Sequence, residues 1–145
     1  MPRASAYFDT SVLLKRYVDE TGAPRARALL RRYRFVSSAL TPVEALSALN
    51  RRLRAGELVA TDFEAIVTRL RSDRAIWDLV SLSPAVLGLA EQVVRDTGVR
   101  TLDAVQLAAA QSVRTLSGQS VPFITADARQ RAAAVKLGLD VTWVE

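Results

Sequence analysis

The sequence predicts an α/β fold in which a parallel sheet of about five strands carries helices on both faces. Short apolar runs alternate along the chain with longer segments of helical periodicity, and no β-hairpin signal joins neighbouring strands. The chain has 145 residues, 50% of them hydrophobic, and shows no internal repeat and no linker. These features indicate one domain over residues 1–145.

The first half of the chain contains two strand signals and four helix signals. Strands are expected over residues 5–8 and 35–38. Helices are expected over residues 11–18, 26–33, 41–55 and 61–76. Gly22 and Pro24 separate the first two helices, and Thr41-Pro42 opens the third. Gly56 follows that helix at the position where glycine commonly ends one.

The second half repeats the alternation of strand and helix. Strands are expected over residues 79–82, 121–125 and 141–144. Helices are expected over residues 84–97, from 101 or 102 through at least 110, and over 127–137. Pro84 suits the first position of its helix, and Gly98 and Gly138 suit the positions just past helix ends.

The composition removes several classes of chemistry. The chain has no His and no Cys, which excludes zinc fingers, thiol nucleophiles, Ser-His nucleophiles and His-based RNA cleavage. A metal site would therefore be built from oxygen ligands, which prefer hard cations such as Mg²⁺ and Mn²⁺. No apolar run approaches the roughly 20 residues of a membrane span, and no signal peptide is evident, so we expect a cytoplasmic protein without membrane contact.

The charge balance is positive. The formal net charge is +5, from 18 Arg and 2 Lys against 15 acids. This modestly favours a polyanionic partner, and the guanidinium fork suits phosphate. Two arginine clusters, within residues 25–34 and 51–54, are either guides for RNA or ordinary solvated helix faces.

Four acids fall where predicted strands lead into helices. Asp9 directly follows the first strand, and Glu44 lies in the first turn of the helix after the second. Asp103 lies in the first turn of the Ala-rich helix, and Asp127 follows residues 121–125 by two positions. In open parallel sheets, ligands bind outside the carboxyl ends of the strands. We therefore expect these acids at one edge of the sheet.

Helix capping is the alternative explanation for each acid taken singly. Acids stabilise helix N-termini, and Thr41-Pro42-Val43-Glu44 has the spacing of a capping box. Thr61-Asp62-Phe63-Glu64 has the same spacing but follows a helix-to-helix turn, so we assign it no chemistry. Four converging carboxylates would repel one another without a cation, which makes a divalent metal site the consistent interpretation of the set.

Ordered segments containing these acids resemble the PIN-domain ribonucleases, specifically the VapC-type toxins of bacterial toxin–antitoxin pairs. The matching segments are residues 7–11, 41–45, 101–108 and 123–127, with a similar C-terminal end over 132–141. The resemblance runs over nearly the whole chain and implies the PIN-like α/β fold described above.

The resemblance implies metal-dependent hydrolysis of RNA phosphodiester bonds. Asp9, Glu44, Asp103 and Asp127 occupy the acidic positions and would hold Mg²⁺ or Mn²⁺, with Asp127 the most variable position. Ser11 and Thr125 occupy hydroxyl positions and would contact metal-bound water or phosphate, or else are ordinary hydroxyls near helix starts. Arg100 would clamp a phosphate, unless it is a solvated loop arginine.

The resemblance also implies partners: an RNA substrate, a cognate VapB-type antitoxin and a second copy of the chain in a homodimer. Apolar residues within 41–76 would form the protein contacts or belong to the core. Three alternatives remain open: a non-catalytic scaffold for RNA or protein, a nuclease for structured DNA, and a phosphatase with Asp9 as nucleophile. Ser11 argues against the phosphatase, which has a second acid at that position.

Overall fold

The computed structural model describes residues 2–145, which contain five β-strands and seven α-helices. The strands are β1 (Ser5–Phe8), β2 (Arg34–Ser38), β3 (Asp78–Val80), β4 (Phe123–Thr125) and β5 (Val141–Trp143). The helices are α1 (Thr10–Tyr17), α2 (Ala23–Arg32), α3 (Thr41–Arg54), α4 (Ala60–Asp73), α5 (Pro84–Thr97), α6 (Thr101–Ser117) and α7 (Ala128–Lys136), and a short 3₁₀-helix η1 (Arg74–Ile76) follows α4. Every predicted element is present, with ends displaced by a few residues.

The five strands form one sheet in the order β3-β2-β1-β4-β5, and all four pairings are parallel. This confirms the predicted fold class. Tyr7 of β1 pairs with Val36 of β2 on one side and with Phe123 of β4 on the other. The chain runs outward from β1 through β2 to β3 and then returns to place β4 beside β1. The switch point of the sheet therefore lies between β1 and β4, which is where open α/β sheets bind ligands.

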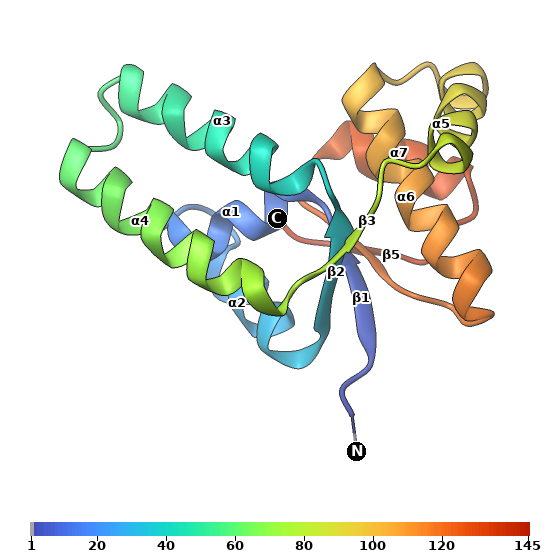
Figure 1. Cartoon of the computed structure of the whole chain (residues 1–145), viewed down its shortest axis with the longest axis horizontal. Helices are drawn as coiled ribbons and strands as arrows, with labels where there is room; N and C mark the ends of the chain where they lie inside the picture. Colours follow the sequence, from blue (N-terminus) through green and yellow to red (C-terminus); the bar gives the residue numbers. More distant parts are fainter. Residues whose placement is uncertain (1) are drawn as a thin grey trace.

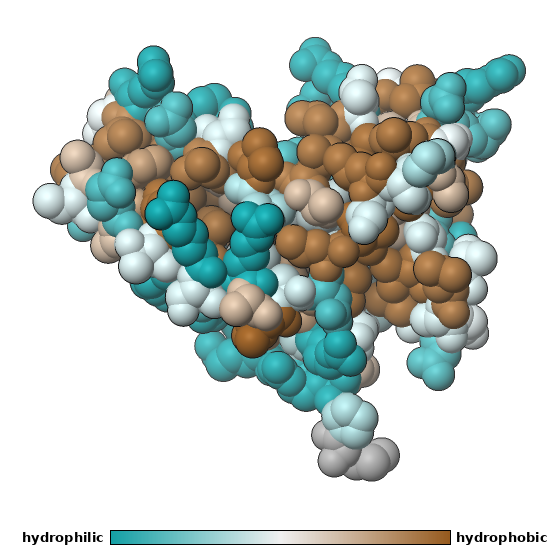
Figure 2. Space-filling view, viewed as in Figure 1, coloured by the Kyte–Doolittle hydropathy of each residue, from teal (hydrophilic) through white to brown (hydrophobic). Residues whose placement is uncertain are grey.

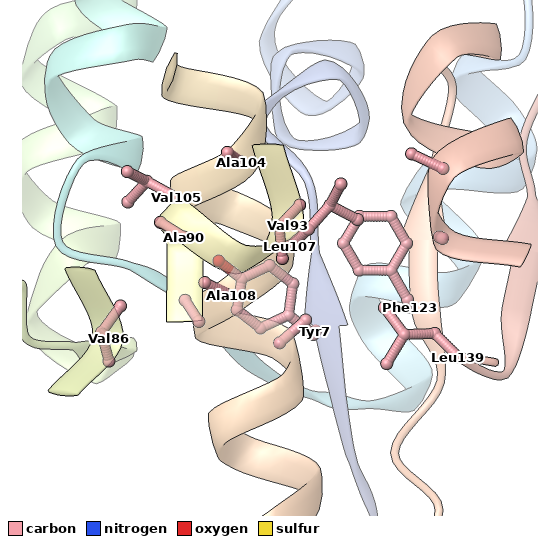
Figure 3. Close-up of a cluster of buried hydrophobic side chains, with 14 of the residues drawn as sticks. Tyr7, Val86, Ala90, Val93, Ala104, Val105, Leu107, Ala108, Phe123 and Leu139 are labelled. Carbon is pink, nitrogen blue, oxygen red and sulfur yellow. The ribbon is translucent and has the colours of Figure 1, made fainter. Parts of the chain in front are cut away.

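Helices cover both faces of the sheet, with α1–α4 on one side and α5–α7 on the other (Figure 1). Successive side chains of a strand point to opposite faces, so β1 contributes to both layers. Ala6 and Phe8 pack with residues of α1–α4, whereas Tyr7 packs with residues of α5–α7. Figure 3 shows the second layer, in which Tyr7 and Phe123 stack with ring centroids 5.7 Å apart. Burial on both faces explains why β1 is apolar at each of its last three residues.

Helices α3 and α4 pair as a hairpin that extends away from the sheet (Figure 1). The space-filling view shows a notch between this hairpin and the layer of α5–α7, on the side where the strands end (Figure 2). Hydrophobic side chains gather beside the notch in the same view. None of the helices within residues 2–145 is long and apolar enough to cross a membrane.

The end of the chain packs against the turn before α2. Gly22 adopts a φ of +83°, which is the left-handed region that favours glycine. A Cβ atom at this position would lie 1.5 Å from the carbonyl oxygen of Glu145. Gly22 is therefore required both by its own backbone conformation and by the close approach of the C-terminal main chain.

Candidate active site

The structure brings the four predicted acids to the wall of one cavity of about 380 Å³, which we call the acid cavity. Asp9 and Asp127 come from the ends of β1 and β4, on either side of the switch point. Glu44 and Asp103 come from the first turns of α3 and α6. The rest of the wall consists of Thr10, Ser11, Leu14, Leu40, Val43, Ser47, Ala48, Arg51 and Leu102.

Asp9 stands at the N-cap position of α1, yet its carboxylate makes no capping hydrogen bond. Its Oδ2 instead accepts hydrogen bonds from Ser11 Oγ at 2.8 Å and from Thr125 Oγ1 at 2.9 Å. These hydroxyls in turn accept from the backbone N–H groups of Ala126 and Asp127, each at 3.0 Å. One oxygen of Asp9 is thus fixed, while Oδ1 has no hydrogen-bond partner within residues 2–145.

Burial dominates the electrostatics of Asp9, whose side chain is almost inaccessible to solvent. Loss of hydration raises the pKa of Asp9 from its ordinary 3.8 to about 6. The hydrogen bonds from Ser11 and Thr125 lower this pKa, and the nearby charges of Glu44 and Asp127 raise it. Asp9 therefore sits in a site that disfavours its charge unless a cation is present.

Glu44 is held by a buried amide rather than by the end of its helix. Its Oε1 accepts hydrogen bonds from Thr10 Oγ1 at 3.0 Å and from Gln106 Nε2 at 2.5 Å. Gln106 is almost fully buried, and its Oε1 accepts a hydrogen bond from the Tyr7 hydroxyl at 2.5 Å. Its Nε2 also lies 3.0 Å from Thr41 Oγ1. Strand β1 and helices α1, α3 and α6 therefore meet at this one amide.

Asp103 is half-buried and makes no side-chain hydrogen bond within residues 2–145. Its pKa is raised, first by burial and then by the negative charge of Asp127. Arg129 and Arg100 act in the opposite direction and lower the pKa of Asp103. The carboxylate thus lies within electrostatic reach of one acid and two arginines.

Asp127 is the one acid of the four that caps its helix through its side chain. Its Oδ1 accepts hydrogen bonds from the backbone N–H of Arg129 at 2.8 Å and of Gln130 at 3.2 Å. Oδ2 has no hydrogen-bond partner among the described residues. One carboxylate oxygen of Asp127 therefore caps α7, and the other is available to a ligand in the acid cavity.

Comparison with known proteins decides the family. The sequence matches the model of the PIN domain family over residues 6–136. This chain belongs to the PIN-domain family. A search of curated proteins finds no match. Among solved structures, a chain of a toxin–antitoxin complex from Klebsiella pneumoniae has the same fold, with a TM-score of 0.69, 18% sequence identity, and coverage of 95% of this chain and 96% of that one.

PIN domains are generally nucleases, and the donor set of this PIN domain suits a hard divalent cation. The acid cavity offers carboxylate oxygens, of which Asp9 Oδ1 and Asp127 Oδ2 are free of protein hydrogen bonds, as are both oxygens of Asp103. Within residues 2–145, no three acids stand close enough to form a ready-made metal site. The donors therefore fit Mg²⁺ or Mn²⁺ in kind, and binding would require these carboxylates to draw together around the ion.

The two predicted hydroxyl residues, Ser11 and Thr125, both donate hydrogen bonds to Asp9. Thr125 is fully buried and does not line the acid cavity, so its hydroxyl orients the carboxylate. Ser11 does line the cavity, but its hydroxyl both donates to Asp9 and accepts from Ala126 N. Arg100 is exposed and lies outside the acid cavity, in the wall of a neighbouring one.

The predicted capping box at Thr41 is wrong, and the segment with the same spacing at Thr61 forms none either. Helix α3 begins at Thr41 itself, after Leu40, and the buried Thr41 hydroxyl lies 2.6 Å from Ser37 Oγ rather than on the helix end. Helix α4 begins one residue before Thr61, so that hydroxyl is already inside the helix, and no side chain caps it. The Thr41 hydroxyl instead belongs to a buried polar network beneath the acid cavity, in which it contacts Ser37 and Gln106.

Sequence reasoning missed the role of Gln106. The residue stands three positions after Asp103 in an otherwise apolar stretch of α6 that is buried throughout. A buried amide must find hydrogen-bond partners, so a lone Gln among buried Ala, Val and Leu side chains is a usable signal. Its partners Tyr7 and Thr10 come from about 100 residues earlier, which local spacing does not reveal.

Proposed function

We propose that this PIN domain is a Mg²⁺- or Mn²⁺-dependent endoribonuclease and the toxin of a toxin–antitoxin pair. The observation that carries the proposal is the convergence of Asp9, Glu44, Asp103 and Asp127 on one cavity at the switch point of the sheet. Caps require no like-charged neighbours, and three of the four acids make no cap with their side chains. A cluster of carboxylates is the arrangement that metal-dependent phosphodiester hydrolysis needs.

The four acids would hold the metal, and the residues behind them fix two of the four. When bound, the metal supplies polarisation of the phosphate and a lowered pKa of water. Ser11 and Thr125 hold Asp9 with Oδ1 free, and Gln106 and Thr10 hold Glu44. Because the pKa of Asp9 and that of Asp103 are raised without metal, binding displaces protons and strengthens as the pH rises.

The charge distribution favours a phosphate-rich substrate such as RNA. The net charge is +5, and Arg51 of α3 lines the acid cavity beside the carboxylates. Arg27, Arg34 and Arg52 form ion pairs with acids, and Arg51 is the one arginine of these clusters that lines the acid cavity, which makes it the best placed to meet the substrate.

An antitoxin partner is supported by the structural neighbour, which is part of a toxin–antitoxin complex. A second hollow, of about 500 Å³, lies between α3 and α4 and is lined by apolar Val43, Leu46, Phe63 and Val67 among others. It shares Val43 and Ser47 with the acid cavity. One extended partner segment would therefore lie along the hairpin and reach the carboxylates. Leu46 is exposed, whereas Leu49 and Ile66 belong to the core.

The decisive experiment is cleavage of a mixed pool of short single-stranded RNAs by the purified chain. We expect cleavage with Mn²⁺, none with EDTA, and losses of at least about 100-fold for Asp9→Asn and Asp103→Asn. Asp62→Asn is the matched control, because Asp62 also lies in the first turn of a helix but outside the acid cavity. Equal activity of Asp9→Asn and Asp62→Asn would refute the proposed site.

Metal binding separates the enzyme from its alternatives. The nuclease should show a higher melting temperature in Mn²⁺, lost in Asp9→Asn, whereas a non-catalytic scaffold should show no shift. Cleavage of structured DNA in preference to RNA would assign the substrate to the alternative nuclease.

The toxin and its assembly require separate tests. Production of the chain in a bacterial host should arrest growth, and Asp9→Asn should not. Light scattering should give the mass of a homodimer, and a monomer at micromolar concentration would contradict that part of the proposal.

A further inference from the structure

A second cavity of about 380 Å³ borders the acid cavity on the far side of Asp103, and we call it the basic cavity. Its wall includes Arg100 just before α6, and Arg129 and Lys136 from α7. Asp103 lines both cavities, so the two hollows share a single side chain as their boundary. The basic cavity thus places three cations next to the carboxylates of the candidate active site.

These cations have no partner that accounts for their gathering. Five ion pairs occur within residues 2–145, and none includes Arg100, Arg129 or Lys136. Their side chains also make no hydrogen bond to described residues. Asp103 is the one acid in the wall, against three cations. The hollow therefore has an excess positive charge.

The main chain at this place adds to the attraction for an anion. Helix α6 runs for 17 residues and begins beside Arg100 without a side-chain cap. Free N–H groups and the positive end of the helix dipole favour negative charge there. The guanidinium and ammonium groups of the basic cavity suit phosphate oxygens in particular.

We infer that the basic cavity is a subsite for a backbone phosphate of the RNA strand, adjacent to the phosphodiester that is cleaved at the acid cavity. This inference rests on the proposed function, because the subsite is defined relative to the phosphodiester that is cleaved. Asp103 lies between the two phosphate positions of the RNA strand. A strand with its scissile phosphate among the carboxylates would place a neighbouring phosphate among the three cations. The subsite increases the affinity for RNA strands of several nucleotides and does not distinguish one base from another.

The test compares substrates of different length with the double variant Arg129→Gln/Lys136→Gln. A dinucleoside monophosphate has one phosphate and cannot occupy both cavities, whereas a ten-nucleotide RNA can. We expect the ratio of kcat/KM for the ten-nucleotide RNA to that for the dinucleotide to fall about tenfold or more. The matched control Arg74→Gln/Arg95→Gln removes the same charge from exposed positions outside both cavities and should keep the ratio.

An unchanged ratio in the double variant would overturn the inference. The ratio is also unchanged if kcat/KM falls equally on both substrates, and that result would mean that Arg129 acts through Asp103 rather than on a second phosphate. The melting-temperature shift in Mn²⁺ should persist in the double variant.

Binding of the ten-nucleotide RNA in EDTA tests the subsite without cleavage. The double variant should weaken binding about tenfold and lower the dependence of log Kd on log salt by roughly 0.7 per lost phosphate contact. If the wild type binds RNA in this way but never cleaves it, the subsite stands and the proposed activity fails. Equal binding by the double variant and the control would instead assign the basic cavity to another ligand, such as an acidic protein segment.

Discussion

Asp9 has the strongest electrostatic consequence of any single residue in the acid cavity. Its carboxyl is buried, two hydroxyls fix one oxygen, and the pKa rises to about 6. The folded chain therefore holds a proton on Asp9 at pH values where the unfolded chain has released it. Protonation of Asp9 therefore depends on folding, on the pH and on whether a metal ion is bound.

The first prediction concerns stability against pH without metal. Between about pH 4 and pH 6 the folded chain binds more protons than the unfolded chain, so the free energy of unfolding falls as the pH rises. The total loss from Asp9 is on the order of 3 kcal/mol. Denaturant unfolding in EDTA should show this slope for the wild type. Asp9→Asn should show a much smaller slope, because only Asp103 still has a raised pKa, and should be the more stable protein at pH 8.

Gln106 gives the second prediction at this scale. Gln106→Leu leaves the buried Tyr7 hydroxyl without its acceptor and the partly buried Glu44 without its amide donor. We expect the free energy of unfolding to fall by about 1–3 kcal/mol and the melting-temperature shift in Mn²⁺ to shrink. Gln92→Leu is the control, because Gln92 is exposed on α5. Equal effects in the two variants would remove Gln106 from the positioning of Glu44.

At the scale of the element, the sequence signals were reliable for the existence of helices and strands and unreliable for what their end residues do. Pro84 and Gly98 delimit α5 as expected, and its cap is the side chain of Ser83. The same Thr-x-x-Glu spacing occurs at the starts of α3 and α4, and a capping box forms at neither. Local spacing contains no information about a buried hydroxyl or amide that arrives from a distant segment and competes for the same groups.

Asp127 allows its two tasks to be separated, which is the third prediction. Asp127→Asn keeps an oxygen that can cap α7, so stability should change little, whereas Asp127→Ala should cost about 1 kcal/mol. Both variants should lose nuclease activity, because both remove the charge from the acid cavity. Ser83→Ala is the control, since it deletes a comparable cap at α5 and should leave activity intact. Full activity in Asp127→Asn would show that Asp127 only caps its helix.

At the scale of the whole molecule, the parallel sheet was predictable from the sequence pattern, and the convergence of the four acids from the rule that ligands bind outside the carboxyl ends of parallel strands. The alternation of apolar runs and helical segments indicated the fold, and the acids at 9 and 127 proved to flank the switch point. The strand order, the basic cavity and the Gln106 network were not predictable. Each depends on which strands become neighbours, and therefore on contacts between residues far apart in the chain.

The fourth prediction concerns the packing of the C-terminus. Gly22→Ala would place a Cβ atom against the Glu145 carbonyl oxygen and also force a positive φ on alanine. We expect a loss of more than about 2 kcal/mol in the free energy of unfolding. Gly56→Ala has a similar φ of +76° but no atom within 4 Å, so it should lose only about 1–2 kcal/mol. Urea denaturation of the two variants measures the difference, and equal losses would mean that the contact with Glu145 contributes nothing.

The pairing of β1 with β4 has a consequence for the synthesis of the protein on the ribosome. Asp9 leaves the ribosome early, but the hydroxyl of Thr125 and the carboxylate of Asp127 follow more than 110 residues later. During most of its synthesis the growing chain contains Asp9, Glu44 and then Asp103 without the strand that gathers them. A chain that cuts RNA would therefore remain harmless to the message and the ribosome producing it. It would become active only when its final strands have been released and folded.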